Sequence, residues 1–152
     1  LVRYYKWNKP HTFFGPTSGA MGYALPAAIS AKLARPGSPA VAFAGDGGFA
    51  MTMSELETAV RYKLDKLVAI VFNNNCYGTI SRHQKREFPG RNVGTSLGRI
   101  SFADIANAVG ARGYSVNSNE EFPAALKLAL AAEGPAVIDI AVSYKHPGSW
   151  ET

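Results

Sequence analysis

Three short, mainly apolar runs constrain the fold of this chain more than any other feature. The runs are AVAFA (residues 40–44), LVAIVF (67–72) and AVIDIAV (136–142). Apolar runs of this length are typical of strands that are covered on both faces, as in parallel sheets. Because helix-like segments separate the runs, we predict an α/β fold with three layers, α/β/α, around a mostly parallel central sheet.

Helical segments are predicted in the intervals between these runs. Residues 21–33 (MGYALPAAISAKL) are small and apolar, and Pro26 should either kink this helix or shift its start. Three more helices are predicted from capping patterns, which lie at Ser54–Glu57, Ser101–Asp104 and Ser118–Glu121. These helices are expected to end near Tyr62, Val109 and Ala132. Residues 113–116 are expected to form a short additional strand.

The length of the chain, 152 residues, is that of a single domain. Its first residues, LVRYYKWNKPH, begin without an initiator methionine and resemble neither a signal peptide nor a first strand. We therefore expect residues 1–152 to be one domain cut from a longer protein. No apolar run approaches the roughly 18 residues that a membrane span needs, so we expect no membrane contact and predict a cytoplasmic location.

The basic residues are partly concentrated between Cys76 and Ile100, in a chain of formal net charge +5. This stretch is polar and has no clear period, and we predict a long loop there that is functional or mobile. No recognised nucleic-acid motif accompanies the charge, so we expect a solvent-facing or anion-facing loop and no nucleic-acid partner. Within it, His83 is either a surface residue or a contact to substrate or to another subunit. His11 and His146, near the chain ends, are expected to be structural or disordered.

Two polar turns follow the first two predicted strands. Gly45–Gly48 (GDGG) follows the first, and Asn73–Asn75 follows the second. Because the carboxyl ends of parallel strands meet at one edge of a sheet, where ligands collect, both turns should lie together. Asp46 offers a carboxylate and the asparagines offer amide oxygens, which suit Mg²⁺ once a diphosphate adds its own oxygens. Neither a Walker A nor a GxGxxG pattern is present, and two ordinary turns are the alternative.

The residues around these turns resemble a known family. GAMG (19–22), GDGGF (45–49) and NNNCYGTI (73–80) together resemble the bipartite thiamine diphosphate (ThDP) motif. The chain is similar to the C-terminal ThDP-binding (PP) domain of the acetolactate synthase-like enzymes. The likeness covers nearly the whole chain and is densest over residues 12–91.

The resemblance implies a magnesium ion that joins the protein to the cofactor diphosphate. Asp46 would be the carboxylate ligand of Mg²⁺, or of Ca²⁺ in its place. Asn74 would be the amide ligand, and the backbone carbonyl of Cys76 the third protein ligand. The usual family spacing after the aspartate ends one residue earlier, at Asn73, which is the alternative to Asn74. We prefer Asn74, because an extra residue in the turn at 63–67 disturbs the fold less than a shifted strand end.

The resemblance also implies which residues contact ThDP. They are Gly19, Ala20, Met21, Gly45, Asp46, Gly47, Gly48, Asn74, Cys76, Tyr77, Gly78 and Thr79. Backbone N–H groups of Gly47–Gly48 and Gly78–Thr79 would approach the diphosphate, and Gly19 and Met21 would hold the aminopyrimidine ring through backbone contacts. The Met21 side chain would support the bent shape of the cofactor; the alternative is a methionine of the hydrophobic core.

The activity that the resemblance implies is ThDP-dependent decarboxylation of a 2-oxo acid and transfer of the resulting enamine or acyl carbanion. A 2-oxo acid decarboxylase or oxidase of the same family is one alternative. A non-catalytic α/β module whose basic loop binds a partner or polyanion is another. The family places the activating glutamate on the pyrimidine-binding domain of a neighbouring subunit, in a homodimer or homotetramer. Since no segment here resembles that domain or the central domain, we expect no catalytic residue in this chain and no turnover from it alone.

Overall fold

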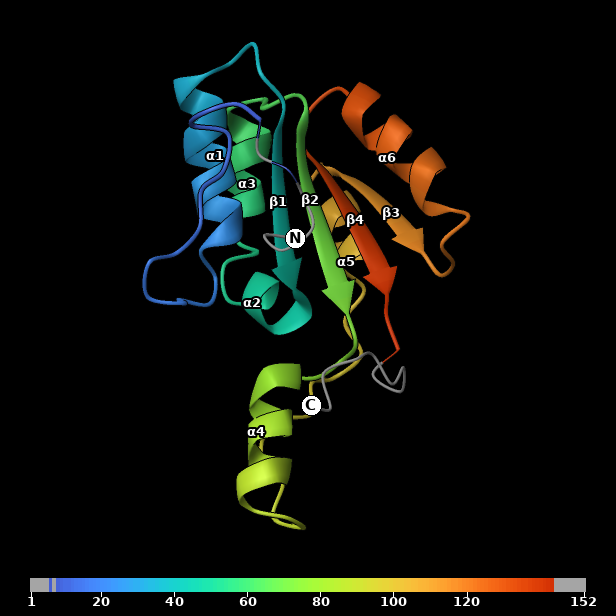
Figure 1. The fold of residues 1–152 in the computed structure, drawn as a ribbon. Helices are drawn as coiled ribbons and strands as arrows, with labels where there is room; N and C mark the ends of the chain where they lie inside the picture. The colour runs from blue at the N-terminus through green and yellow to red at the C-terminus, as the bar shows by residue number, and fades with distance from the viewer. Residues whose placement is uncertain (1–5, 7, 144–152) are drawn as a thin grey trace.

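A parallel sheet forms the centre of the computed structural model, which describes residues 6 and 8–143 (Figure 1). Within these residues the sheet has four strands: β1 (Ala40–Gly45), β2 (Leu67–Asn73), β3 (Arg112–Val116) and β4 (Ala136–Ala141). Their order is β1-β2-β4-β3, and every neighbouring pair is parallel. The predicted α/β fold with a parallel sheet is therefore confirmed, including the short strand expected at residues 113–116.

Helices cover the two faces of the sheet unequally. One face carries α1 (Ala24–Ala34), α2 (Asp46–Ala50), α3 (Glu55–Arg61) and α5 (Phe102–Ala108), and the other carries α6 (Phe122–Ala131). On the first face Phe49 and Phe102 meet edge to face, with ring centroids 5.3 Å apart. Each fully buried side chain of this size stabilises the fold by about 1.5–3 kcal/mol. On the second face the strands β2, β3 and β4 pack against α6.

The outer strand β1 departs from the expectation that it is covered on both faces. Ala42 is buried against the first layer of helices, but Val41 and Phe43 on the opposite face are each 39% exposed. The reason is the placement of α6, which packs on β2, β3 and β4. An apolar strip of β1 is consequently open, and it runs along the strand towards its carboxyl end at Gly45, where ligands are expected.

The starts of two helices match the sequence prediction only in part. α1 begins at Ala24 and not at residue 21, so that Pro26 falls in the first turn, where proline is tolerated. α3 has the expected extent, but Ser54 itself has helical φ and ψ angles and makes no capping bond, so the predicted capping box is wrong. The chain reaches α3 through consecutive turns from α2, which already satisfy its first N–H groups.

The two later caps have different outcomes. Ser101 caps α5 as predicted, with its hydroxyl accepting from the Asp104 N–H at 3.3 Å. α6 begins only at Phe122, so Ser118 is not its cap. Two hydrogen bonds instead hold the pKa of the Glu120 carboxyl below its usual value. The larger effect comes from the Glu120 N–H and the smaller from the Ser118 hydroxyl.

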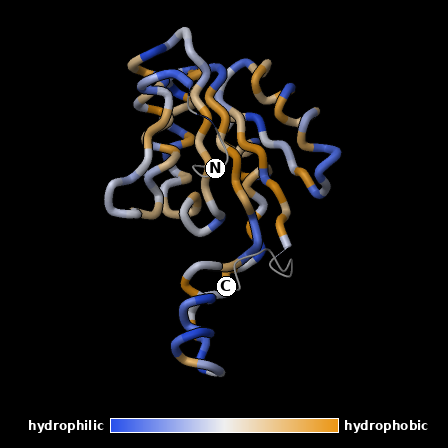
Figure 2. Tube along the Cα trace, viewed as in Figure 1, coloured by the Kyte–Doolittle hydropathy of each residue, from blue (hydrophilic) through white to orange (hydrophobic). Residues whose placement is uncertain are grey.

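The stretch predicted as a loop between Cys76 and Ile100 contains a helix, α4 (Gly78–Glu87). We call residues 74–99 the α4 arm. The arm projects beyond the carboxyl ends of the strands and is mainly hydrophilic (Figures 1 and 2). Its return segment pairs with the helix, since the Gln84 side chain accepts from the Val93 N–H at 2.9 Å and donates to the Val93 carbonyl at 3.0 Å. The prediction of a structureless loop was wrong because this helix is polar and mostly exposed, with Ser81 as its buried residue, so it has few apolar residues to mark it in the sequence.

Among the described residues, no helix has both the length and the apolar character needed to cross a bilayer.

A buried lysine joins the end of α1 to the start of β1. The Lys32 side chain is 2% exposed, and its ammonium donates to the carbonyls of Pro36 and Ser38 and pairs with Asp65 at 3.2 Å. We expect Lys32→Met to lower the free energy of unfolding by about 2 kcal/mol, because hydrogen bonds to charged groups contribute about 1.5–3 kcal/mol. Asp65 is 57% exposed, so Asp65→Asn should cost less than about 1 kcal/mol. Urea denaturation measures the free energy of unfolding of both variants. Equal losses would contradict the assignment of the larger contribution to the hydrogen bonds of Lys32.

Candidate functional site

The two polar segments predicted as turns lie side by side at the carboxyl edge of the sheet, but Gly45 ends β1 and Asp46–Gly48 begin the helix α2 instead of forming a turn. Asp46 directly follows β1, and Asn74 directly follows β2. These strands are neighbours, with Gly45 of β1 in register with Phe72 of β2. Sheet pairing therefore brings together residues that are 28 positions apart in the chain.

Asp46 is a buried carboxylate, 4% exposed, that backbone groups hold in place. One oxygen, Oδ1, accepts from the Gly47 N–H at 2.7 Å. The other, Oδ2, accepts from the N–H groups of Asn74 and Cys76, both at 3.1 Å. Within the described residues Asp46 has no cationic side chain as a partner. A buried carboxylate without a cation costs free energy, so this site favours a bound positive charge.

The Asn74 side chain converges on the same point. Its Oδ1 accepts from the Cys76 N–H at 3.0 Å, so one N–H is shared by Asn74 Oδ1 and Asp46 Oδ2. Asn74 Oδ1 accepts from this one N–H, and within the described residues Asp46 Oδ1 accepts only from Gly47, so each of these two oxygens keeps a lone pair for a cation. The Cys76 carbonyl accepts from the Gly78 N–H at 2.7 Å, and a carbonyl oxygen has a second lone pair as well.

Asn73, the alternative ligand, has its side chain in a different place. Its amide nitrogen donates to the Ile100 carbonyl at 2.9 Å and to Asp139 Oδ1 at 3.0 Å. Its Oδ1 faces the Asn75 N–H at 3.3 Å. The geometry thus directs Asn74, rather than Asn73, towards Asp46.

A single cavity of about 1210 Å³ gathers the predicted cofactor contacts. All twelve residues named from the sequence line it: Gly19, Ala20, Met21, Gly45, Asp46, Gly47, Gly48, Asn74, Cys76, Tyr77, Gly78 and Thr79. Asn73 is not among the lining residues. Segments from three separate parts of the chain therefore share one wall.

Two glycines of this wall have a steric reason to be glycine. A β-carbon at Gly47 would lie 2.4 Å from Cε1 of Tyr77, so the tyrosine ring packs directly on this turn. Gly22 has φ +84°, and a β-carbon there would lie 3.0 Å from Cγ2 of Thr52. The Thr52 hydroxyl also donates to the Gly22 carbonyl at 2.9 Å, which ties the GAMG turn to the segment after α2.

Met21 is not part of the hydrophobic core. It is 46% exposed and borders the cavity, in the turn that ends at Gly22. The preceding Gly19 has φ +67°, a left-handed conformation that favours glycine. A large flexible side chain that faces a cavity is available for contact with a ligand.

The apolar part of the cavity was not predicted from the sequence. Val41 and Phe43 of β1 line it, together with Phe72 and Ile80. The signal was the alternation of larger Val41 and Phe43 with alanines in AVAFA, which we interpreted as a uniformly buried run. Asp139 was also missed, although it is the one acidic residue in the otherwise apolar run AVIDIAV.

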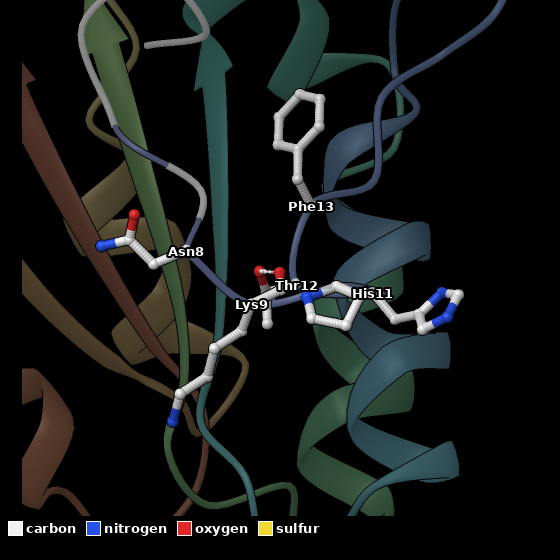
Figure 3. A pocket seen from close by; sticks show the side chains of 6 residues that line it. Asn8, Lys9, His11, Thr12 and Phe13 are labelled. Carbon is white, nitrogen blue, oxygen red and sulfur yellow. Dashed lines mark hydrogen bonds between the residues drawn. The ribbon is translucent and has the colours of Figure 1, made fainter.

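The histidines lie away from this wall or at its margin. His83 is exposed on α4, with Nδ1 3.2 Å from the Arg86 guanidinium. His11 is exposed and lines both the large cavity and a second, smaller hollow of residues 8–13, where the Thr12 hydroxyl donates to the Lys9 carbonyl (Figure 3). None of the twelve predicted contact residues lines that hollow. His146 lies outside the described residues.

The donor set suits a magnesium diphosphate better than a protein-only metal site. In the described part of the chain, no three His, Cys, Asp or Glu side chains cluster as metal ligands. Mg²⁺ is usually held by one or two carboxylates together with substrate phosphates and water. One buried carboxylate, one amide oxygen and one carbonyl beside glycine turns meet that description.

Comparisons with known proteins agree with this geometry. Residues 1–140 match the family model of the thiamine pyrophosphate enzyme, C-terminal TPP binding domain, where TPP is another name for ThDP. The chain is 42% identical over 128 residues to sulfoacetaldehyde acetyltransferase of Alcaligenes xylosoxydans xylosoxydans, covering 84% of this chain and 21% of the relative. It is 36% identical over 145 residues to acetolactate synthase of Bacillus subtilis (strain 168), covering 95% and 25%.

A solved structure is similar as well. The thiamine diphosphate-dependent 4-hydroxybenzoylformate decarboxylase of Rhodococcus jostii RHA1 matches with a TM-score of 0.78 and 35% identity, over 84% of this chain and 24% of that one. The chain spans about a fifth to a quarter of the length of these relatives.

Proposed function

The chain belongs to the family of C-terminal TPP-binding domains of thiamine pyrophosphate enzymes, and on that premise we propose that it binds the magnesium diphosphate of ThDP in an acetolactate synthase-like enzyme. The proposed enzyme decarboxylates a 2-oxo acid and transfers the acyl unit to a second substrate. The observation that carries the proposal is the convergence of Asp46 Oδ2 and Asn74 Oδ1 on one N–H, inside a cavity lined by all the predicted contact residues.

Three protein oxygens would hold the metal in this proposal. They come from the Asp46 carboxylate, the Asn74 amide and the Cys76 carbonyl, and diphosphate oxygens and water would complete the roughly six ligands of Mg²⁺. Gly48 and Thr79 lie in the first turns of α2 and α4, where N–H groups have no partner within the helix. They could therefore donate to phosphate.

When bound, ThDP supplies the stabilised carbanion that cleavage of a carbon–carbon bond next to a carbonyl requires. The protein binds and orients. Met21 borders the cavity and would support the cofactor rings, and the apolar wall of Val41, Phe43 and Phe72 would keep water from the reacting carbon.

The acid that activates the cofactor is proposed to come from a neighbouring subunit. Among the described residues that line the cavity, Asp46 is the only one with a carboxylate. We assign that carboxylate to the metal. We propose that residues 1–152 are one ThDP-binding domain of a longer polypeptide that works as a homodimer or homotetramer. The cytoplasmic location expected from the sequence stays a prediction.

Sulfoacetaldehyde is a second candidate substrate. The relative with 42% identity is named as its acetyltransferase, against 36% for the acetolactate synthase. The acetolactate synthase-like reaction and the sulfoacetaldehyde acetyltransferase reaction require the same ThDP site. They differ in the substrates that donate and accept the transferred group.

The test of this proposal is cofactor-dependent stability of the full-length protein. We expect ThDP with Mg²⁺ at about 100 times its dissociation constant to stabilise the fold by about 2.7 kcal/mol, seen as a higher thermal midpoint, and EDTA to remove the effect. A shift that polyanions produce and ThDP does not would favour a non-catalytic module. Assays of carbon dioxide release with pyruvate and larger 2-oxo acids, and of acetyl transfer with sulfoacetaldehyde, then separate the candidate reactions.

A further inference from the structure

We propose that Asn73 and Asp139 are positioning residues, which hold the metal-binding turn Asn74–Cys76 in place without touching the metal. With the backbone of Ile100 and Phe102 they form what we call the end clamp. The proposal rests on the proposed function, because it concerns the same magnesium diphosphate site.

The end clamp is a closed set of hydrogen bonds. The Asn73 amide nitrogen has two hydrogens, and these go to the Ile100 carbonyl at 2.9 Å and to Asp139 Oδ1 at 3.0 Å. The other oxygen, Asp139 Oδ2, accepts from the Phe102 N–H at 2.8 Å. Asp139 is only 8% exposed. Both hydrogens of the amide and both oxygens of the carboxylate are thus used inside the protein.

The position of these residues in the chain gives the clamp its effect. Asn73 is the last residue of β2, and Ile100 comes just before the start of α5 at Phe102. The α4 arm, residues 74–99, therefore begins and ends at the clamp. Asp139 lies in the middle of the sheet on β4, in register with Val71, so it joins both ends of the arm to a rigid strand. Loops are more mobile than strands, and fixing the two ends of a loop restricts it.

The metal-binding turn is the first part of the arm after the clamp. Asn74 and Cys76 donate their N–H groups to Asp46 Oδ2, and Asn75 between them has φ +56°, in the left-handed region. The direction in which the Asn74 amide points depends on the backbone that precedes it. A shift of the Asn73 backbone would therefore move the Asn74 oxygen and the Cys76 carbonyl relative to Asp46. Residues that hold the metal ligands in place without touching the metal typically change metal affinity by about 10–100-fold when they are mutated.

A purely structural role is the competing interpretation. Asp139 also bonds the first N–H of α5, so that its loss could simply destabilise that helix. Ser101 offers a matched control, since its hydroxyl accepts from the Asp104 N–H at the start of the same helix. Ser101 has no side-chain bond to Asn73 or to the metal-binding turn. A purely structural role predicts that mutation lowers stability alone. A positioning role predicts that it also lowers the affinity for the metal.

The experiment compares Asp139→Asn and Ser101→Ala in the full-length protein. In Asp139→Asn an amide NH₂ replaces one carboxylate oxygen and faces a donor, either the Asn73 amide or the Phe102 N–H. We expect the dissociation constant for Mg²⁺, measured by calorimetry at saturating ThDP, to rise about tenfold. Ser101→Ala should lower the thermal midpoint but leave that constant within about twofold. If Asp139→Asn changes Mg²⁺ affinity no more than Ser101→Ala does, the proposal is wrong.

A second variant and a second measurement guard against an unfolded Asp139→Asn protein. Asn73→Ala breaks the clamp from the other side and should raise the same dissociation constant, and the two changes together should be less than additive because they remove one network. Hydrogen exchange of the peptide that contains Cys76, measured without metal or ThDP, should speed up in both clamp variants but not in Ser101→Ala. Unchanged exchange would overturn the proposal. Failure of the wild-type protein to bind ThDP would instead refute the proposed function.

Discussion

Replacing Asp46 by asparagine is expected to abolish the magnesium-dependent binding of ThDP to the full-length protein. The variant keeps the size of the side chain and one acceptor oxygen for the neighbouring N–H groups, but it removes the only carboxylate among the described lining residues of the cavity. Loss of a residue that only orients a metal ligand costs about 10–100-fold in metal affinity. Because a direct ligand should matter more, we expect ThDP affinity in Mg²⁺ to fall by at least about 100-fold. Calorimetric titration with ThDP, in Mg²⁺ and in EDTA, measures this loss.

Asp65→Asn serves as the control for the charge change. Asp65 is an exposed acid that pairs with Lys32 and does not line the cavity, so its replacement should leave ThDP affinity unchanged. Binding of ThDP to Asp46→Asn within about threefold of wild type would show that the diphosphate is held elsewhere. Equal losses in both variants would point to a general effect of charge.

Among the substitutions considered, replacing Gly113 by alanine is expected to lower the free energy of unfolding most. A β-carbon at this position of β3 would lie 1.9 Å from the Ala103 carbonyl oxygen of α5, and 2.5 Å from the carbonyl carbon. The obstacle is backbone, so no side chain can rotate away. The Gly113 N–H also donates to the Asn107 side chain at 2.9 Å, so the strand cannot move without losing that bond. We expect a cost of about 3 kcal/mol or more, at the upper end of the range for overpacking.

Gly37→Ala is the matched control for this prediction. A β-carbon at Gly37 would meet no atom within 4 Å, and its backbone is not in the left-handed region. The change should be neutral or should stabilise the protein by up to about 1 kcal/mol, because alanine reduces the freedom of the unfolded chain. Midpoints of urea denaturation of the two variants decide the matter. A loss below about 1 kcal/mol for Gly113→Ala would mean that α5 and β3 separate at little cost.

The outline of the fold could be predicted because it depends on local patterns. The run LVAIVF and the turns around Asp46 and Asn74 are short stretches whose residue types favour one conformation. The motif around them identified the family through residues that are close together in the chain. Two expectations failed for a common reason: the helix α4 and the open face of β1 both depend on neighbours that a sequence pattern does not reveal.

The three consecutive asparagines show most directly what could not be predicted from the sequence alone. In the sequence, Asn73, Asn74 and Asn75 offer the same chemistry, and spacing alone left Asn73 and Asn74 as alternatives. In the structure each does something different. Asn73 bonds Asp139 and Ile100, Asn74 converges with Asp46, and Asn75 adopts φ +56°, a conformation in which asparagine is enriched.

By itself, the sequence determined the alternation of strands and helices apart from α2 and α4, the polar segments that follow β1 and β2, and the types of residue that could hold a magnesium diphosphate. Only the tertiary structure decided which asparagine faces Asp46 and that Asp139, 66 positions from Asn73, lies against it. The physical reason is that successive side chains along a strand point to opposite faces, and pairing between distant strands sets what each face meets. A shift of one residue moves an amide from the place that faces Asp46 to the end clamp, and no local pattern contains that choice.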